Sequence, residues 1–172
     1  QRVQFFSAKA SRLPMLRQLL AENKNKRPLR FMETHNGLTG LIVEKARASR
    51  VSGEVVEFDG FWSSSLTDST MMGKPDNESL DISMRLKGVD QIFDVTSKPL
   101  IFDGDTGGKI EHFESKIKTM ERLGVSSIII EDKKGLKKNS LLTNTKSQIQ
   151  EDIKTFSEKI STGKKAQLSN DF

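Results

Sequence analysis

Three acidic residues with the chemistry of metal ligands stand directly after two apolar stretches of the sequence. Asp103 and Asp105 follow residues 99–102, and Glu131 follows residues 126–130. The chain has two histidines and no cysteine, whereas carboxylates are the hard oxygen ligands that Mg²⁺ and Mn²⁺ prefer. We therefore expect Asp103, Asp105 and Glu131 to hold one of these ions and not zinc. Glycines within DGDTGG would let the backbone approach a ligand closely.

A lysine-rich stretch after Glu131 adds anion-binding chemistry. Residues 131–142 read EDKKGLKKNSLL, in which four lysines surround a glycine and precede Asn139. Lysines above a metal hold phosphate or carboxylate oxygens, and an asparagine amide donates to developing negative charge. Long polar loops beside such sites often act as lids. The alternative interpretation is a solvated run of charge.

Hydroxyl side chains form a third candidate group. Residues 62–76 read WSSSLTDSTMMGKPD, so serines follow the end of a predicted strand. At such a position, hydroxyls and backbone N–H groups can bind an oxyanion. Ordinary serine and threonine turn chemistry is the alternative. Asp76 ends this stretch and, taken alone, has the sequence context of a helix cap.

Alternating helices and strands position these residues. Apolar residues at helical spacing predict helices at 11–23, 37–48, 77–95, 110–123 and 147–160. Short apolar runs predict strands at 29–33, 57–63, 99–102 and 126–130, with a polar surface loop at 47–54. Strands that alternate with helices form parallel sheets, and the carboxyl ends of such strands carry the active site. The candidate residues follow these strand ends.

Two α/β architectures satisfy this pattern, a doubly wound parallel sheet and a (β/α)8 TIM-type barrel. A barrel typically needs about 250 residues. The 172 residues would then form its first four strand–helix units, as one partial barrel domain spanning residues 1–172 and truncated before the fifth strand.

Composition restricts the other functions. Without cysteine the sequence forms no disulfide, iron–sulfur cluster or thiol nucleophile, which fits a cytoplasmic protein. No apolar run approaches the roughly 18 residues that span a bilayer, and no signal-peptide pattern opens the chain, so we expect no membrane partner. The net charge is +5, with much of the basic excess in residues 24–30. Because one Trp and no Tyr leave little aromatic surface for stacking on bases, we expect no nucleic-acid partner.

Together these residues resemble the phosphoenolpyruvate mutase family of the isocitrate lyase/phosphonomutase superfamily. The resemblance rests on METHNGL, FDGFWSSSLTDST, GKPD, LIFDGDTGGK and, above all, IIIEDKKGLKKNSLL. It runs from about residue 8 to the end of the chain. The lysine- and asparagine-bearing element is specific to the mutases and their nearest relatives, whereas the paired aspartates and the glutamate are shared across the superfamily.

The resemblance implies a TIM-type barrel with a Mg²⁺ site. Asp103 would be the principal metal anchor, and Asp105 and Glu131 would hold the metal's waters. Four residues would line the site for the pyruvyl carboxylate and enolate: Trp62, Ser64, Ser65 and Leu66.

The resemblance also implies the residues that handle the phosphoryl group. Lys137 and Asn139 would lie on a mobile gating loop and contact that group. Asp76 matches a family aspartate that would act as a nucleophile or, in a dissociative route, as a positioning group.

The reaction implied is the Mg²⁺-dependent interconversion of phosphoenolpyruvate and phosphonopyruvate by a homo-oligomeric enzyme with a small-molecule substrate. A phosphonopyruvate hydrolase, or another Mg²⁺-dependent α-keto-acid enzyme of the superfamily, is the alternative. The lack of cysteine argues against the C–C lyases, whose corresponding loop carries that residue. An alternative from another class is a noncatalytic half-barrel that must associate in order to fold, because open sheet edges invite pairing.

Overall fold

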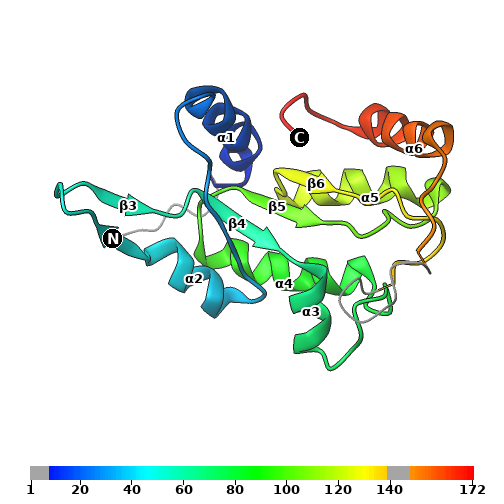
Figure 1. Cartoon of the computed structure of the whole chain (residues 1–172), viewed down its shortest axis with the longest axis horizontal. Coiled ribbons are helices and arrows are strands. Elements are labelled where there is room, and N and C mark those ends of the chain that lie inside the picture. Colours follow the sequence, from blue (N-terminus) through cyan, green and yellow to red (C-terminus); the bar gives the residue numbers. More distant parts are fainter. Residues whose placement is uncertain (1–7, 139–147) are drawn as a thin grey trace.

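A four-stranded parallel sheet forms the centre of the protein, in a computed structural model that describes residues 8–138 and 148–172 (Figure 1). In sheet order the strands are β1 (Phe31–Glu33), β4 (Gly60–Ser63), β5 (Leu100–Asp103) and β6 (Ser127–Ile129). The helices are α1 (Ala8–Asn23), α2 (Gly37–Lys45), α3 (Ser65–Met71), α4 (Ile82–Val95), α5 (Ile110–Leu123) and α6 (Ile153–Ala166). Within the described ranges, no helix is long and apolar enough to cross a membrane.

The pairing of the strands brings their carboxyl ends to one edge of the sheet. All three pairings are parallel, and the last paired residues are Glu33–Trp62, Ser63–Phe102 and Asp103–Ile129. The loops that follow β4, β5 and β6 therefore leave the sheet from the same edge. In open and closed parallel sheets this edge carries the functional residues.

The apolar core lies between the sheet and its helices. Phe61 of β4 and Phe102 of β5 are fully buried, whereas Trp62 and Ile101 are partly exposed. This alternation follows from the pleat of the strands, which points successive side chains to opposite faces. On the helical side, α2 packs beside α4 and α5 packs beside α6 (Figure 1).

Local sequence signals set the ends of several helices. The Asn36 side chain accepts a hydrogen bond from the Thr39 N–H at the start of α2, and Asp81 accepts one from Ser83 at the start of α4. Gly124 ends α5 in the left-handed region, with φ of 105°. The predicted helix at 110–123 is confirmed with these bounds.

The prediction was wrong between residues 47 and 59, whereas β4 confirms the end of the strand predicted at 57–63. Residues expected to form a polar loop contain β2 (Arg47–Ser49), which pairs with β3 (Val55–Glu57) in an exposed antiparallel hairpin. The single strand expected at 57–63 is therefore divided between β3 and β4. Arg47 and Glu57 face each other across the hairpin and form an ion pair of 3.1 Å. Charged cross-strand partners look like loop residues in a sequence because their pairing is not local.

The stretch after β4 was expected to be a loop, yet it turns at once into α3. Ser64 caps this short helix by accepting a hydrogen bond from the Thr67 N–H. The helix predicted at 77–95 begins later, at Ile82, and the helix predicted at 37–48 ends earlier, at Lys45.

The last helix also differs from its prediction. Instead of ending before Gly163, it runs from Ile153 to Ala166 and includes that glycine. The reason is tertiary packing: a Cβ atom at Gly163 would lie 2.7 Å from the ring of Phe113 on α5. Glycine therefore serves here as a contact point between two helices and not as a helix stop.

Candidate active site

Asp103, the last residue of β5, is held by donors from two loops. The Ser65 N–H and hydroxyl donate to its Oδ2 at 3.1 Å and 2.8 Å, and the Asp105 N–H donates to its Oδ1 at 3.0 Å. Burial alone raises the pKa of Asp103, but these hydrogen bonds and the charge of Lys137 together hold it below its usual value. Asp103 is therefore an ionised carboxylate at neutral pH.

Asp105 occupies a tight loop between β5 and α5. Its φ is 53°, a left-handed conformation that aspartate tolerates better than most residues. Its carbonyl accepts a hydrogen bond of 2.7 Å from the Glu131 N–H, which joins this loop to the end of β6. The preceding Gly104 has no room for a side chain, because a Cβ atom there would lie 2.5 Å from the Ile128 side chain.

Lys137 extends from the loop after β6 into this cluster. Its Nζ lies 2.6 Å from Ser65 Oγ, 3.0 Å from Asp105 Oδ1 and 3.1 Å from Asp76 Oδ2. Burial lowers the pKa of Lys137, but Asp105, Asp103 and Asp76 outweigh it, so the pKa lies above its usual value. The solvated-run interpretation is therefore wrong for Lys137, which is 6% exposed.

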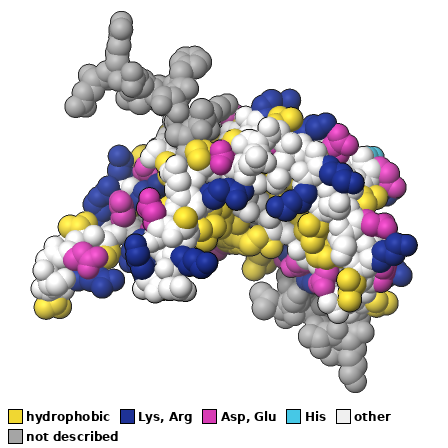
Figure 2. All heavy atoms as spheres, turned by 90° about the horizontal axis from the view of Figure 1, so that it is seen from above, with side chains coloured by type: hydrophobic (Ala, Val, Ile, Leu, Met, Phe, Trp, Pro, Cys, Tyr) yellow, Lys and Arg dark blue, Asp and Glu magenta, His cyan; other side chains and the backbone are white. Residues whose placement is uncertain are grey.

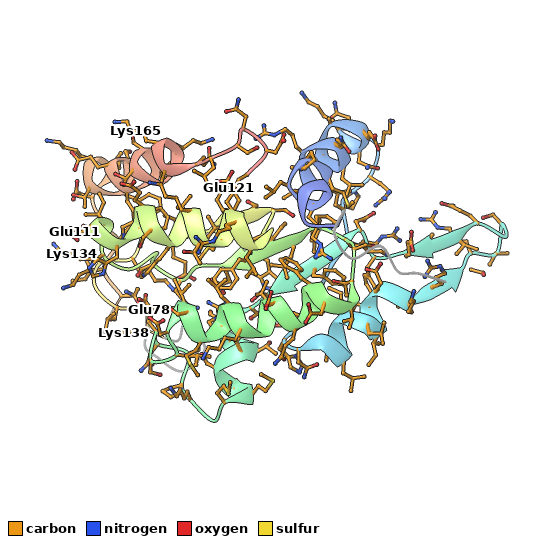
Figure 3. The ribbon with its side chains drawn as sticks, turned by 180° about the vertical axis from the view of Figure 1, so that it is seen from behind. Glu78, Glu111, Glu121, Lys134, Lys138 and Lys165 are labelled. Carbon is orange, nitrogen blue, oxygen red and sulfur yellow. The ribbon has the colours of Figure 1, made fainter. Side chains whose placement is uncertain are left out.

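Glu78 ties the lysine loop to the loop after β5. Its Oε1 accepts hydrogen bonds from the backbone N–H of Lys137 at 3.1 Å and of Thr106 at 3.3 Å. Figure 3 shows Glu78 at the same end of the molecule as Lys138. The position of Lys137 is therefore supported by its backbone as well as by its side chain.

Arg85 is a buried residue of the site that the sequence analysis missed. It lies on α4, and its guanidinium donates to Asp68 Oδ2 at 2.8 Å, to the Asp103 carbonyl at 2.5 Å and to Asp105 Oδ2 at 3.3 Å. Burial raises the pKa of Asp68 despite the opposing charge of Arg85. One signal could have identified Arg85: it stands on the helix face formed by Ile82, Leu86 and Val89, where an apolar residue is expected.

The structure brings five of the ten predicted site residues together. Asp76, Asp103, Asp105 and Lys137 form one cluster with Ser65. Asn139 lies outside the described residues.

The remaining described candidates are not among the residues that form this cluster. Glu131 is partly exposed, and its Oε2 lies 2.6 Å from Lys133 Nζ. Trp62 is partly exposed on β4, Ser64 is buried as the cap of α3, and Leu66 is 37% exposed. Their side chains do not join the ion-pair network that links Asp105 to Lys137.

The donor set fits a divalent cation bound by oxygen. When the adjoining pair of Asp68 and Arg85 is counted with the cluster, four carboxylates meet two cationic side chains, which leaves a formal excess of two negative charges: Asp68, Asp76, Asp103 and Asp105 against Arg85 and Lys137. The buried Asp76 Oδ1 has no hydrogen-bond partner among the described residues. Over the same residues no three acidic or histidine side chains converge closely enough to form a complete ligand cage. Such a site suits Mg²⁺, which keeps several waters and uses one or two carboxylates.

The cavities of the protein differ in character. A space of about 50 Å³ borders Glu78, Gly104 and Asp105, so it adjoins the carboxylate cluster. A larger cavity of about 210 Å³ lies between α5, α6 and β6, has a mainly apolar lining and shares no residue with the cluster. Figure 2 shows hydrophobic side chains gathered near the middle of one face, with basic and acidic groups around them. The site is therefore defined by its charged groups and not by the size of its cavity.

A parallel sheet flanked by helices, with ionisable groups beyond the carboxyl ends of its strands, defines the α/β class to which TIM-type barrel enzymes belong. The chain belongs to the phosphoenolpyruvate phosphomutase family, whose model matches residues 16–172.

Individual relatives agree with this assignment. The chain is 32% identical over 143 residues to a phosphoenolpyruvate phosphomutase of Tetrahymena pyriformis, covering 83% of this chain and 44% of that protein. It is 31% identical over 142 residues to a phosphonopyruvate hydrolase of Variovorax sp. (strain Pal2), covering 82% and 45%.

Solved structures show the same likeness. A phosphoenolpyruvate phosphomutase from Streptomyces platensis subsp. rosaceus superposes with a TM-score of 0.79 and 28% identity, covering 93% of this chain and 51% of that chain. A phosphonopyruvate hydrolase in complex with oxalate and Mg²⁺ superposes with a TM-score of 0.73 and 28% identity, covering 94% and 50%. The chain thus spans about half the length of these relatives, and its fold corresponds to the first four strand–helix units of a TIM-type barrel.

Proposed function

We propose that this chain carries the metal-binding and phosphoryl-binding half of an isomerase that interconverts phosphoenolpyruvate and phosphonopyruvate, forming a carbon–phosphorus bond by intramolecular phosphoryl transfer. One observation carries the proposal. The lysine loop beyond β6 places the Lys137 ammonium against Asp76, Asp105 and Ser65 at the carboxyl edge of the sheet. This arrangement supports the proposal, because a cation held by the carboxylates would lie beside an ammonium that would bind phosphoryl oxygens.

Asp103, Asp105 and Glu131 are the residues that would hold Mg²⁺. When bound, the ion would supply positive charge to the oxygens of an enolate and of a phosphoryl group. Asp103 suits this role because its pKa is lowered, so its carboxylate remains ionised at neutral pH.

Lys137 would bind a phosphoryl oxygen with its ammonium, assisted by Asn139 from the same loop. Phosphoryl transfer passes through a loose transition state, so fixed positive charge and exclusion of water are the main demands on the protein. Lys137, Asp76 and Asp105 are each at most 6% exposed, which provides this exclusion. Asp76 would position the phosphoryl group or act as its nucleophile.

The pyruvyl part of the substrate would lie beyond β4. Trp62, Ser64, Ser65 and Leu66 follow one another along the end of this strand and the start of α3. The Ser65 hydroxyl already accepts a hydrogen bond from Lys137 and donates to Asp103, so it would connect the two halves of the substrate site.

Phosphonopyruvate hydrolysis is a second candidate function. Identity to the hydrolase relative, at 31%, is nearly the same as identity to the mutase relative, at 32%. The two reactions share the substrate and differ in whether the phosphoryl group returns to pyruvate oxygen or reaches water.

Phosphorus NMR of the chain with phosphonopyruvate and Mg²⁺ tests both functions. A phosphoenolpyruvate signal supports the mutase, whereas inorganic phosphate supports the hydrolase. Lys137→Ala should suppress formation of either product. Lys134→Ala changes an exposed lysine of the same loop and should leave product formation unchanged. Unchanged phosphonopyruvate in the presence of the wild-type chain would refute catalytic activity of these 172 residues.

We also propose that residues 1–172 act as one partial barrel domain within a homo-oligomer. β1 and β6 lie at the two ends of the sheet order, and Ile129 on β6 is 49% exposed. Unpaired strand edges with exposed apolar residues favour association. Light scattering after size exclusion would measure the mass, and a monomer at micromolar concentration would contradict the proposal.

A further inference from the structure

Arg85 makes a set of contacts that no exposed ion pair would make. Its side chain is 1% exposed, and the guanidinium lies over the Phe102 ring at 4.3 Å from the ring centre. In addition to the bonds to Asp68, Asp103 and Asp105, Nη2 donates to the Ser63 carbonyl at 3.2 Å. A single side chain therefore joins the ends of β4 and β5.

These contacts determine how Asp105 can point. Arg85 binds Asp105 Oδ2 and the Asp103 carbonyl through the same nitrogen. Asp105 Oδ1 is left facing Lys137 Nζ at 3.0 Å. The Asp105 backbone is left-handed, with φ of 53°, and these contacts help to hold the loop in this conformation.

A guanidinium suits this position better than an ammonium. It is planar and presents five donors in fixed directions, whereas lysine is a compact point charge. Here those directions lead to two strand ends and to the carboxylates of Asp68 and Asp105. Asp68 is itself held by the Ser63 hydroxyl at 3.0 Å.

We propose that Arg85 is a positioning residue of the metal site: it orients Asp105 and the Asp103 backbone so that their carboxylates bind Mg²⁺. This inference rests on the proposed function, because it assumes that these carboxylates hold the ion. The partners that orient metal ligands typically contribute about 10–100-fold to metal affinity. Arg85 lies on α4, outside the loops that carry the candidate ligands, and it acts through Asp105.

The opposing interpretation is that Arg85 and Asp68 only stabilise the fold as a buried ion pair. Two variants separate these roles. Arg85→Ala removes the guanidinium but leaves Asp68 buried without its partner, which can unfold the protein. Arg85→Met combined with Asp68→Leu removes both charges, and apolar replacement of a buried pair is often neutral or stabilising. This double variant also keeps the net charge of the cluster unchanged, so an altered affinity cannot result from a change in net charge.

The experiment is titration calorimetry with Mg²⁺ alone, with the fold of each variant monitored by far-UV circular dichroism. The wild type should bind Mg²⁺, and Asp103→Asn should bind it more than about 100-fold more weakly. The double variant should fold and bind Mg²⁺ about 10–100-fold more weakly. The control is Glu114→Ala with Lys118→Ala, which removes an exposed ion pair on α5 and should leave the affinity unchanged.

For an Arg85→Ala protein that circular dichroism shows to be folded, chemical rescue of Mg²⁺ affinity is a readout that a purely structural role would not produce. Methylguanidinium at a low concentration should restore Mg²⁺ affinity to Arg85→Ala, because it can occupy the space left by the side chain. Sodium chloride at the same concentration should not restore the Mg²⁺ affinity. A folded double variant with wild-type affinity, or an Arg85→Ala protein that needs no rescue, would overturn the inference. A wild type that binds no Mg²⁺ would instead refute the proposed function.

Discussion

Replacing Lys137 by methionine tests the cluster at its centre. The ammonium is buried, and both side chains in each of its ion pairs with Asp76 and Asp105 are at most 7% exposed. Methionine has a similar length but no charge or donor. The variant therefore leaves two buried carboxylates without their shared cation.

The expected loss of stability follows from these contacts. Breaking a buried pair by removing one partner costs about 3–5 kcal/mol. Asp105 retains Arg85 as a partner, which places the effect near the lower end of that range. We expect a loss of about 3 kcal/mol at neutral pH, or a fall of roughly 6–12 °C in the melting temperature for a domain of this size.

The pH dependence has a definite sign. The folded pKa of Lys137 is raised above 10.5, so its contribution is fully present below that pH and is lost as pH rises through the folded pKa. Burial already raises the pKa of Asp105 above its ordinary value, and in the variant Asp105 also loses the positive charge of Lys137, so its folded pKa rises further. Protonation then relieves the buried charge, and the deficit relative to wild type should be smaller near pH 4 than near pH 7.

Urea unfolding followed by Trp62 fluorescence measures this effect, because Trp62 is the single tryptophan of the chain. Lys134→Met is the matched control, since it changes an exposed lysine of the same loop and should shift stability by less than about 0.5 kcal/mol. Equal stability of Lys137→Met and wild type across this pH range would refute the claim that the buried Lys137 ammonium stabilises the fold.

Three further substitutions test neighbouring contacts. Asp103→Asn should reduce the Mg²⁺ affinity measured by calorimetry. Because Asp103 is a proposed ligand, the loss should exceed the roughly 10–100-fold that follows removal of a ligand's supporting partner. Retained affinity would contradict the metal assignment. Ser65→Ala should cost about 1–3 kcal/mol in urea unfolding, because its hydroxyl bonds both Asp103 and Lys137. The lowered pKa of Asp103 adds stability above its unfolded value near 3.9, and this is lost as pH falls through its folded pKa. Ser65→Ala should therefore lose less stability than wild type between about pH 7 and pH 3, and an equal loss would show that the hydroxyl does not lower that pKa. Gly104→Ala should cost about 1–3 kcal/mol by calorimetric melting, since its Cβ would lie 2.5 Å from Ile128, and an unchanged melting temperature would indicate that β6 adjusts freely.

Local sequence patterns predicted the sheet and the position of Asp103 at its carboxyl edge. The strands near residues 31, 100 and 127 and the helix at 110–123 have the expected positions because their apolar residues repeat at strand or helix spacing. Asp103 could be placed at the carboxyl edge because it directly follows an apolar run, and parallel strands share that edge. The hairpin and α3 were missed because cross-strand pairing and a serine cap inside a hydroxyl-rich run leave no clear local periodicity.

By itself, the sequence determined that acidic, hydroxyl and lysine side chains would gather beyond the strands, since the order of elements places them there. Only the tertiary structure decided how those side chains pair. Lys137 forms an ion pair with Asp105, 32 residues away, whereas Lys133 forms one with the nearby Glu131. Arg85 is buried against both strand ends although its residue type predicts an exposed position. The reason is physical: a buried charge is tolerated only where distant segments supply its partners, and the local sequence does not contain those segments.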